Sequence, residues 1–140
     1  METPRGRIER LVAEGRIPRM AVARAERLWH ERLHAGVRMP NGETVQITLD
    51  DLFHVLVDDR IWRHPERIAT ALVHVVEIRR AHSGRRQALS QWTEGSSVQF
   101  AIIILTGESR LWSLHIVDER RAQRYARGGG EVLWQRSQQP

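Results

Sequence analysis

The spacing of apolar residues changes part-way along the chain. Up to about residue 78, apolar residues recur mostly every three or four positions, as they do on one face of a helix. From Arg85 onwards they alternate with polar residues, which is the spacing of strands whose two faces differ. The pattern predicts an α+β fold, in which N-terminal helices precede and pack on one face of a four- to five-stranded, mainly antiparallel sheet.

The first 38 residues are expected to form a helical arm. Their spacing predicts helices over residues 5–14 and 19–34, and a glycine follows each helix as a stop signal. The turn cluster Met-Pro-Asn-Gly at residues 39–42 then marks an internal boundary. We therefore separate a helical arm, residues 1–38, from an α+β domain, residues 39–140.

The domain is expected to begin with a short strand and two helices. Residues 43–48 alternate in character and predict the strand, and residues 49–58 have helical spacing. The strand ends in a threonine which, with Asp51 three residues later, forms the start of a capping box. A second helix is expected to open at His64-Pro65 and to end near residues 76–78, where β-branched residues accumulate.

Three strands are predicted in the second half of the chain, over residues 85–93, 97–105 and 110–118, with glycine-bearing turns between them. The middle strand is apolar on both faces, so we expect it to be central and covered on both sides. A glycine run at residues 128–130 should form a turn before a last apolar segment, residues 131–134.

Composition limits the classes of protein. With 140 residues the chain fits one domain, and its 41% hydrophobic content favours a globular fold over disorder. The absence of cysteine excludes disulfides and thiolate metal sites. Apolar runs are far shorter than the roughly 20 residues of a membrane span, and the first residues do not form a signal-type segment. We expect a cytoplasmic protein with no membrane partner.

Arginine supplies all 22 basic residues, and the formal net charge is +5. Residues 1–38 hold nine arginines against five acidic residues, a net charge of +4. Guanidinium groups fork onto phosphate and stack on bases better than ammonium groups do, so this composition is compatible with nucleic acid. A GC-rich genome explains the same arginine content without any such partner.

Two histidines are candidates for proton transfer. His54 lies at the margin of the apolar stripe of its helix, where we expect it to be partly shielded from water. His115 shares a predicted strand face with Ser113, whereas Trp112 and Leu114 should face the other way with the rest of the apolar residues. Two imidazoles, or one imidazole and a carboxylate, suffice to activate a ribose 2′-hydroxyl and to protonate the leaving 5′-oxygen. Taken alone, each histidine is more simply explained as a structural residue.

One group of arginines surrounds residues 81–84, a turn expected between the second helix and the sheet. The group consists of Arg79, Arg80, Arg85 and Arg86. Such a cluster holds phosphates or stabilises the extra charge of a pentacoordinate transition state, and a solvated turn is the ordinary alternative. Glu77, where the helix meets the sheet, is a candidate base or a partner that orients an arginine.

A second group of arginines lies near the end of the sequence. It consists of Arg120, Arg121, Arg124 and Arg127, with Tyr125. Guanidinium and phenol planes stack on nucleic-acid bases, so this segment is a candidate RNA surface. An exposed helix face without a partner has the same spacing.

Several common motifs are missing from the sequence. There is no HExxH metal motif, no phosphate-binding GxxxxGK[ST] loop and no GxSxG nucleophile elbow. Asp58 and Asp59 are better explained as a solvated helix end than as a metal site. We therefore expect no metal site and no cofactor.

The order of several segments resembles a nuclease superfamily. The segments are VQITLDDLFHVLVDDR, RHPERIATALVHVVEIRR, RRQALSQW, SVQFAIIIL, RLWSLHIV and RYARGGGEVLW, and they resemble the phage-associated branch of the barnase–EndoU–colicin–RelE nucleases over residues 43–136. The resemblance implies metal-independent RNA cleavage on the open face of a sheet. By position it implies functional roles for His54, Arg60, Glu77 and Arg86. Ser113 and His115 are added from strand geometry, not from the resemblance.

Three functional hypotheses follow. The first is an endoribonuclease, toxin-like or from a phage or mobile element, which would have RNA as its substrate and an immunity or antitoxin protein as a partner to look for. The second is a non-catalytic RNA- or DNA-binding module that uses the same basic surfaces. The third is an accessory or assembly protein of a phage or mobile element.

Overall fold

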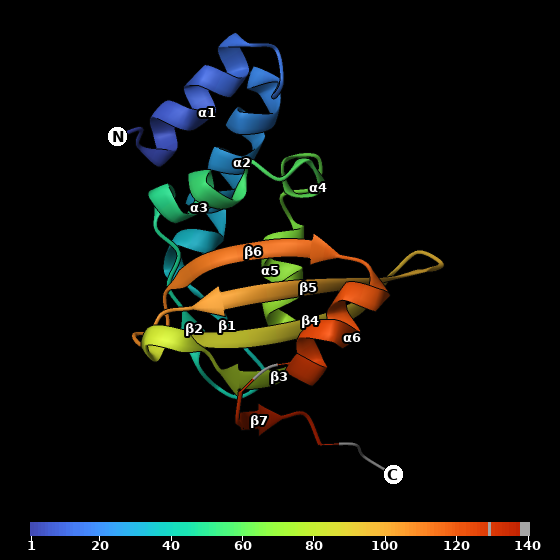
Figure 1. Cartoon of the computed structure of the whole chain (residues 1–140). Helices are drawn as coiled ribbons and strands as arrows, with labels where there is room; N and C mark the ends of the chain where they lie inside the picture. The colour runs from blue at the N-terminus through green and yellow to red at the C-terminus, as the bar shows by residue number, and fades with distance from the viewer. Residues whose placement is uncertain (129, 138–140) are drawn as a thin grey trace.

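The computed structural model describes residues 1–128 and 130–137, and it confirms the α+β fold (Figure 1). Gly129, in the glycine run expected to form a turn, lies outside the described residues. The helices are α1 (Pro4–Ala13), α2 (Arg19–Glu31), α3 (Leu49–Val55), α4 (Asp59–Trp62), α5 (Arg67–Val73) and α6 (Glu119–Gly128), with the 3-10 turns η1 (Leu33–Ala35) and η2 (His82–Gly84). The strands are β1 (Val37–Arg38), β2 (Thr44–Val45), β3 (Val75–Arg80), β4 (Arg86–Glu94), β5 (Ser97–Leu105), β6 (Leu111–Val117) and β7 (Val132–Gln135).

Five strands form one antiparallel sheet in the order β6-β5-β4-β3-β7. β3 to β6 follow one another as hairpins, whereas β7 pairs with β3 at the edge opposite β6. α6 joins β6 to β7 and therefore crosses the sheet from one edge to the other, in front of the strands in Figure 1. The two short strands β1 and β2 pair separately.

One face of the sheet is fully buried, and we call it the core face. Ala88, Ile103 and Leu114 lie side by side on it across β4, β5 and β6, and each is 0% exposed. α5 lies against this face, because the Ser90 hydroxyl of β4 donates a 2.5 Å hydrogen bond to the carbonyl of Ala71. The apolar stripe of α5 and alternate residues of three strands therefore share one hydrophobic core.

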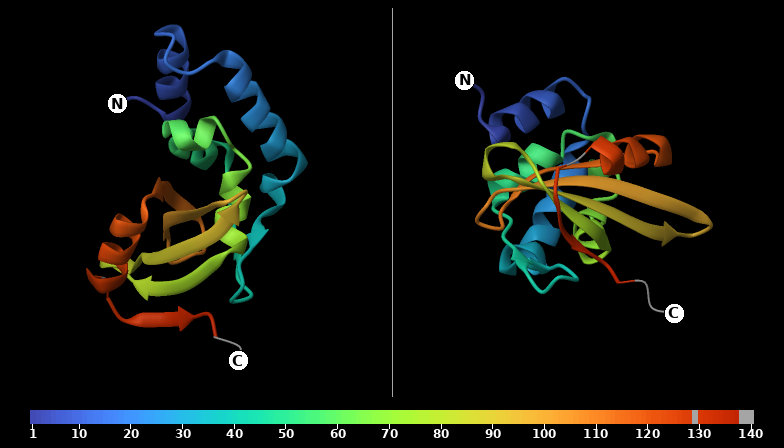
Figure 2. Two further views of the ribbon diagram at one scale, coloured as in Figure 1. Left: turned by 90° about the vertical axis from the view of Figure 1, so that its right-hand side faces the viewer. Right: turned by 60° about the horizontal axis from the view of Figure 1, so that its bottom comes forward.

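The other face is only partly covered, and we call it the open face. One row across β4, β5 and β6 consists of Gln87, Ile104 and Ser113. α6 covers part of the face through Ala122, which packs with Ile102 of β5. Of the helices expected on one face, α5 lies on the core face, and α6 adds a second, smaller layer on the open face (Figure 2).

The arm and the sheet share one core. α1, α3 and α4 lie beyond the β6 edge of the sheet (Figures 1 and 2). The buried cluster runs from Ile8 of α1 through Phe53 of α3 to Ile116 of β6. Residues 39–42, where a boundary is expected, include the turn of the β1–β2 hairpin, and Met39 is 2% exposed.

The second helix of the domain is shorter than expected. α5 ends at Val73, and the residues expected to close the helix form β3 instead. Val75 and Val76 are β-branched, and such side chains favour a strand. Arg79 and Arg80 consequently lie on a strand of the sheet, and the turn that they flank joins β3 to β4 and not a helix to the sheet, as had been predicted.

β6 is irregular at Trp112. The β5–β6 register shifts between Ile104 and Leu105, so Trp112 has no paired residue on β5. Leu114 and Ile116 are buried as expected, but Trp112 remains 48% exposed. The prediction that Trp112 shares their face is therefore wrong.

Two expected elements are reduced in the structure. The strand expected over residues 43–48 contains only Thr44 and Val45, which pair with β1 outside the main sheet. α2 ends at Glu31, and η1 continues it. Among residues 1–128 and 130–137, no helix combines the length and the apolar character needed to cross a membrane.

Candidate nucleic-acid interface on the open face

α3 places His54 beside the start of β6. The predicted capping box is present: Thr48 accepts a hydrogen bond from the Asp51 amide, and Asp51 accepts one from the Thr48 amide. Asp51 also accepts a 2.8 Å hydrogen bond from Nη2 of Arg110, the residue before β6. This bonding raises the pKa of Arg110 and fixes α3 to the strand that carries Trp112.

His54, Arg85 and Trp112 meet from three separate segments, and we call them the Trp112 cluster. The guanidinium carbon of Arg85, which follows η2, lies 4.0 Å from the centroid of the Trp112 ring. The His54 ring centroid lies 6.5 Å from the same indole, with the two rings tilted by 49°. An exposed indole next to a guanidinium and an imidazole offers flat surfaces on which a base can stack.

A second group of side chains lines a cavity of about 700 Å³ between α6 and the start of β4, which we call the α6 cavity. The Arg121 guanidinium carbon lies 5.7 Å from the centroid of the Tyr125 ring. The cavity contains no acidic side chain, and its lining residues are His82, Gln87, Arg121, Arg124, Tyr125 and Gly128. Because two arginines and no acidic side chain line the cavity, its charge favours binding of an anion.

Both groups belong to the open face. Gln87 lines the α6 cavity, and it lies in the same row as Ser113, the residue next to Trp112. Among the described residues, Arg85, Arg121 and Arg124 form no ion pair. Their positive charges are therefore not neutralised within the part of the chain that the structure describes.

His115 lies on β6 three residues after Trp112. Register places it in one row with Ile102 on the open face, and its side chain is 53% exposed. Its Nδ1 atom lies 3.9 Å from Oδ2 of Asp58, the N-cap residue of α4. This separation is longer than a hydrogen bond, so Asp58 places a carboxylate near the His115 ring without fixing its orientation.

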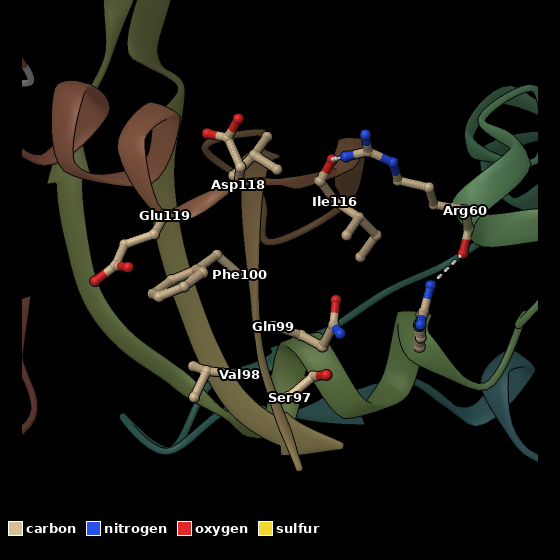
Figure 3. Close-up of a pocket in the computed structure, with 10 residues that line it drawn as sticks. Arg60, Ser97, Val98, Gln99, Phe100, Ile116, Asp118 and Glu119 are labelled. Atoms are coloured by element: carbon tan, nitrogen blue, oxygen red, sulfur yellow. Dashed lines mark hydrogen bonds between the residues drawn. The ribbon is translucent and has the colours of Figure 1, made fainter. Parts of the chain in front are cut away.

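Arg60 is held by the backbone of β6. Its Nη1 donates a 2.9 Å hydrogen bond to the carbonyl of Ile116, the residue after His115 (Figure 3). Figure 3 shows this bond at the rim of a cleft of about 660 Å³ that also contains Phe100 and Glu119. The guanidinium of Arg60 therefore joins α4 to the edge strand and is not part of the Trp112 cluster.

Glu77 is 8% exposed on β3 and pairs with Arg79 at 2.7 Å. Arg79 also donates to the carbonyl of Gly130. Arg80, whose side chain is 64% exposed, pairs with Glu131 at 3.3 Å. Glu77 and these two arginines of β3 are thus engaged in ion pairs near β7.

Arg86 lies on the core face rather than with the histidines. Register aligns it with Leu105, and its Nη1 donates a 2.5 Å hydrogen bond to Glu43. Its Nη2 donates to the hydroxyl of Ser109 at 3.2 Å. The bond from Arg86 holds the pKa of Glu43 below its ordinary value of 4.5. Arg86 therefore joins three segments, and the structure does not bring it to Ser113 or His115.

The remaining candidates lie on α6. Arg120 is exposed and lines a separate hollow of about 430 Å³ together with Arg124 and Arg127. Arg124 lines both this hollow and the α6 cavity. Arg121 and Tyr125 line the α6 cavity. α6 can thus present arginines both towards the sheet and away from it.

Sequence reasoning did not single out His82, Gln87, Trp112 or Asp58 as functional. Trp112 was assigned to the core because nothing in its spacing indicates the bulge that turns it outwards. His82 lies in the turn at residues 81–84, and a histidine among arginines is a usable signal for an anion site. Gln87 gives no signal by itself, since its position depends on the crossing of α6.

Comparisons with protein families, with curated proteins and with solved structures each returned no match for this chain. The resemblance to nucleases therefore stays a prediction. Among the described residues, no group of three or more His, Asp or Glu side chains is arranged to hold a metal ion.

Proposed function

We propose that the open face binds single-stranded RNA and that His54 and His115 cleave the bound strand. The observation that carries the proposal is the Trp112 cluster, in which Arg85 lies 4.0 Å from the indole beside an exposed imidazole. A base would stack on Trp112, and phosphates would lie against Arg121 and Arg124. Stacking of bases on aromatic rings and pairing of phosphates with arginines are the two kinds of contact by which single strands are usually held.

The proposed cleavage needs two proton carriers near one phosphate. One histidine takes the proton of the ribose 2′-hydroxyl, whose oxygen then attacks the phosphorus. The other gives a proton to the leaving 5′-oxygen as the P–O5′ bond breaks. The products are a 2′,3′-cyclic phosphate and a 5′-hydroxyl, and no oxidant or cofactor is consumed.

The surroundings of the histidines suit these roles. Asp58 lies 3.9 Å from Nδ1 of His115, and His54 and Arg85 lie against the same indole. Trp112 and His115 are three residues apart on one strand, about 10 Å along β6, a distance that a dinucleotide spans. A phosphate between Trp112 and His115 would lie near two imidazoles, that of His115 on β6 and that of His54 on α3.

The test is cleavage of a labelled single-stranded RNA in EDTA by the wild-type protein and by His54→Ala and His115→Ala. Loss of a proton carrier lowers the rate by about 100-fold or more. His64→Ala, which removes an exposed histidine after α4, serves as the control and should cleave normally. A wild-type protein that leaves the RNA intact rules out the cleavage step.

A non-catalytic RNA-binding module is the second candidate. The observation that favours it is that Glu77 and Arg86, two of the groups expected to take part in catalysis, are engaged in ion pairs. RNA binding that weakens steeply with salt, without product and without loss in the His54→Ala/His115→Ala double variant, would identify this function.

A further inference from the structure

The strand β5 extends beyond its neighbour β6 at one end. The β5–β6 ladder stops at the pair Phe100–Val117, where the chain leaves the sheet towards α6. β5 itself begins earlier, at Ser97, and its first residues pair with β4 alone in the part of the chain that the structure describes. Figure 1 shows the β4–β5 hairpin reaching past the end of β6. The start of β5 is therefore a short free edge of the sheet.

Val98 directs its backbone groups to this free edge. Residues 95 and 96 form the two-residue turn of the hairpin, so the adjoining pair Glu94–Ser97 exchanges both of its backbone hydrogen bonds. Backbone groups alternate in direction along a strand, and the N–H and C=O of Val98 therefore point away from β4. Val98 is also 50% exposed. An extended segment laid along the edge can pair with these backbone groups.

The free edge lines the cleft of about 660 Å³ at whose rim Arg60 lies, and we call it the β5 cleft (Figure 3). Val98, Phe100 and Ile116 supply apolar side chains to its lining. Its volume falls within the roughly 300–1,000 Å³ of ligand sites. A free strand edge inside a partly apolar cleft suits an extended peptide.

The charges that line the β5 cleft are not balanced. Arg67 is ion-paired with Glu94, and Arg60 donates to a backbone carbonyl. Asp118 and Glu119, at the start of α6, form no ion pair among the described residues. Figure 3 shows Glu119 and Arg60 on opposite sides of the cleft. The α6 side of the cleft therefore attracts a cation and repels phosphate.

We propose that the β5 cleft binds an extended segment of a partner protein that carries an apolar residue two positions from an arginine or lysine. The segment adds a short strand to the free edge and forms backbone hydrogen bonds with Val98. Residues two positions apart lie on one face of a strand, so the apolar side chain packs on Phe100 while the cation pairs with Glu119. The inference requires neither RNA nor the two histidines of the proposed function.

The test is a titration of the isotope-labelled protein with blocked pentapeptides, followed by nuclear magnetic resonance. The probes are Thr-Val-Thr-Arg-Thr and its reverse order, since either strand direction can pair. At least one should shift the amide signals of Val98 and Phe100. Replacing its arginine by glutamate should weaken binding by about two- to fivefold, the effect of one exposed ion pair. An N-methyl group on its valine nitrogen should weaken binding by about fivefold or more, because a backbone hydrogen bond is lost.

Two protein variants test the two kinds of contact. Val98→Pro removes the outward N–H without removing a hydrogen bond to β4, and it should abolish binding. Glu119→Arg should reverse the preference, so that the glutamate peptide binds more tightly. Glu108→Arg, in the exposed β5–β6 turn, is the matched control and should keep the preference for arginine.

Several results would overturn the inference. They are the absence of amide shifts with either arginine peptide, shifts confined to other parts of the protein, and a preference for arginine that survives in Glu119→Arg. If Val98→Pro does not fold, the Glu119→Arg and N-methyl results decide. A single-stranded RNA that shifts the same amides, when neither peptide does, would assign the cleft to RNA instead.

Discussion

The two faces of the sheet use the same strands for different purposes. On the core face, Ile103 is 0% exposed and packs with its neighbours under α5. On the open face, the next residue of the same strand, Ile104, is only partly buried and lies between Gln87 and Ser113. Because successive side chains of a strand point to opposite faces, the core also fixes the spacing of groups on the open face.

The arginines of the sheet differ in whether they are ion-paired. Those that join elements of the fold are ion-paired, as in Arg86–Glu43 on the core face and Arg67–Glu94 between α5 and β4. Arg79, beside Gln87 on the open face, is ion-paired to Glu77 as well, whereas Arg85, Arg121 and Arg124 have no acidic partner in the part of the chain that the structure describes. Net charge alone therefore overstates how many arginines can bind a ligand.

The largest expected effect is on stability. Ile103→Ala removes a fully buried side chain and should lower the free energy of unfolding by about 2–5 kcal/mol. Ile104→Ala, on the opposite face of the same strand, should cost about half as much or less, because its side chain is already in partial contact with water. Urea denaturation measures both, and equal losses would contradict the distinction between the faces.

The next effect is on binding. Trp112→Ala should weaken binding of a single-stranded RNA by about 5- to 150-fold, the usual cost of losing one stacked base. Stability should change little, because Trp112 is 48% exposed. Fluorescence anisotropy with a labelled RNA measures the affinity.

Trp62→Ala provides the control for this loss. Trp62 also has an arginine against its ring, with the Arg63 guanidinium carbon 4.5 Å from the centroid, but it lies on α4 and packs partly against the core. Its RNA affinity should stay within about twofold of wild type. A similar loss in both variants would mean that the indoles of this protein contribute to RNA binding without regard to position.

A smaller effect depends on pH. Arg86 holds the pKa of Glu43 below 4.5, so the pair stabilises the fold above that pH and loses its contribution as pH falls through the lowered value. Glu43→Gln should cost about 1–2 kcal/mol at neutral pH, because a partly exposed charged hydrogen bond is lost. The difference from wild type should shrink in strong acid, which thermal unfolding at several pH values would show. A difference that is constant with pH would contradict the assignment.

The smallest effect concerns a single phosphate contact. Arg124→Gln should reduce RNA affinity modestly and should lower the slope of log affinity against log salt by about one unit. Arg27→Gln, an exposed arginine of α2, should leave the slope unchanged. Identical slopes for wild type and Arg124→Gln would show that the α6 cavity does not bind phosphate.

Local patterns were sufficient for much of the fold. The strand over residues 97–105 was predicted with its bounds, because its short apolar run is flanked by glycine-bearing turns. The capping box of Thr48 and Asp51 was also predicted, since both partners are three residues apart. β3 was missed because the helical spacing of α5 continues into its β-branched residues.

The candidate site was less predictable. His54 and His115 were found as isolated residue types, but the bulge that exposes Trp112 depends on pairing with β5. The position of Arg121 and Tyr125 opposite Gln87 depends on α6 crossing three strands, which no local pattern encodes. Arg86 was grouped with the other arginines of the turn, although the strand places its side chain on the opposite face from Gln87.

The crossing of α6 has a consequence for regulation. Its two ends are attached to strands at opposite edges of the sheet, while Ala122 and Tyr125 pack its middle against the cluster around Ile102. We therefore predict that a competitor strand added along β3 in place of β7 would loosen the end of α6 that carries Arg124 and would alter affinity on the open face from a distance.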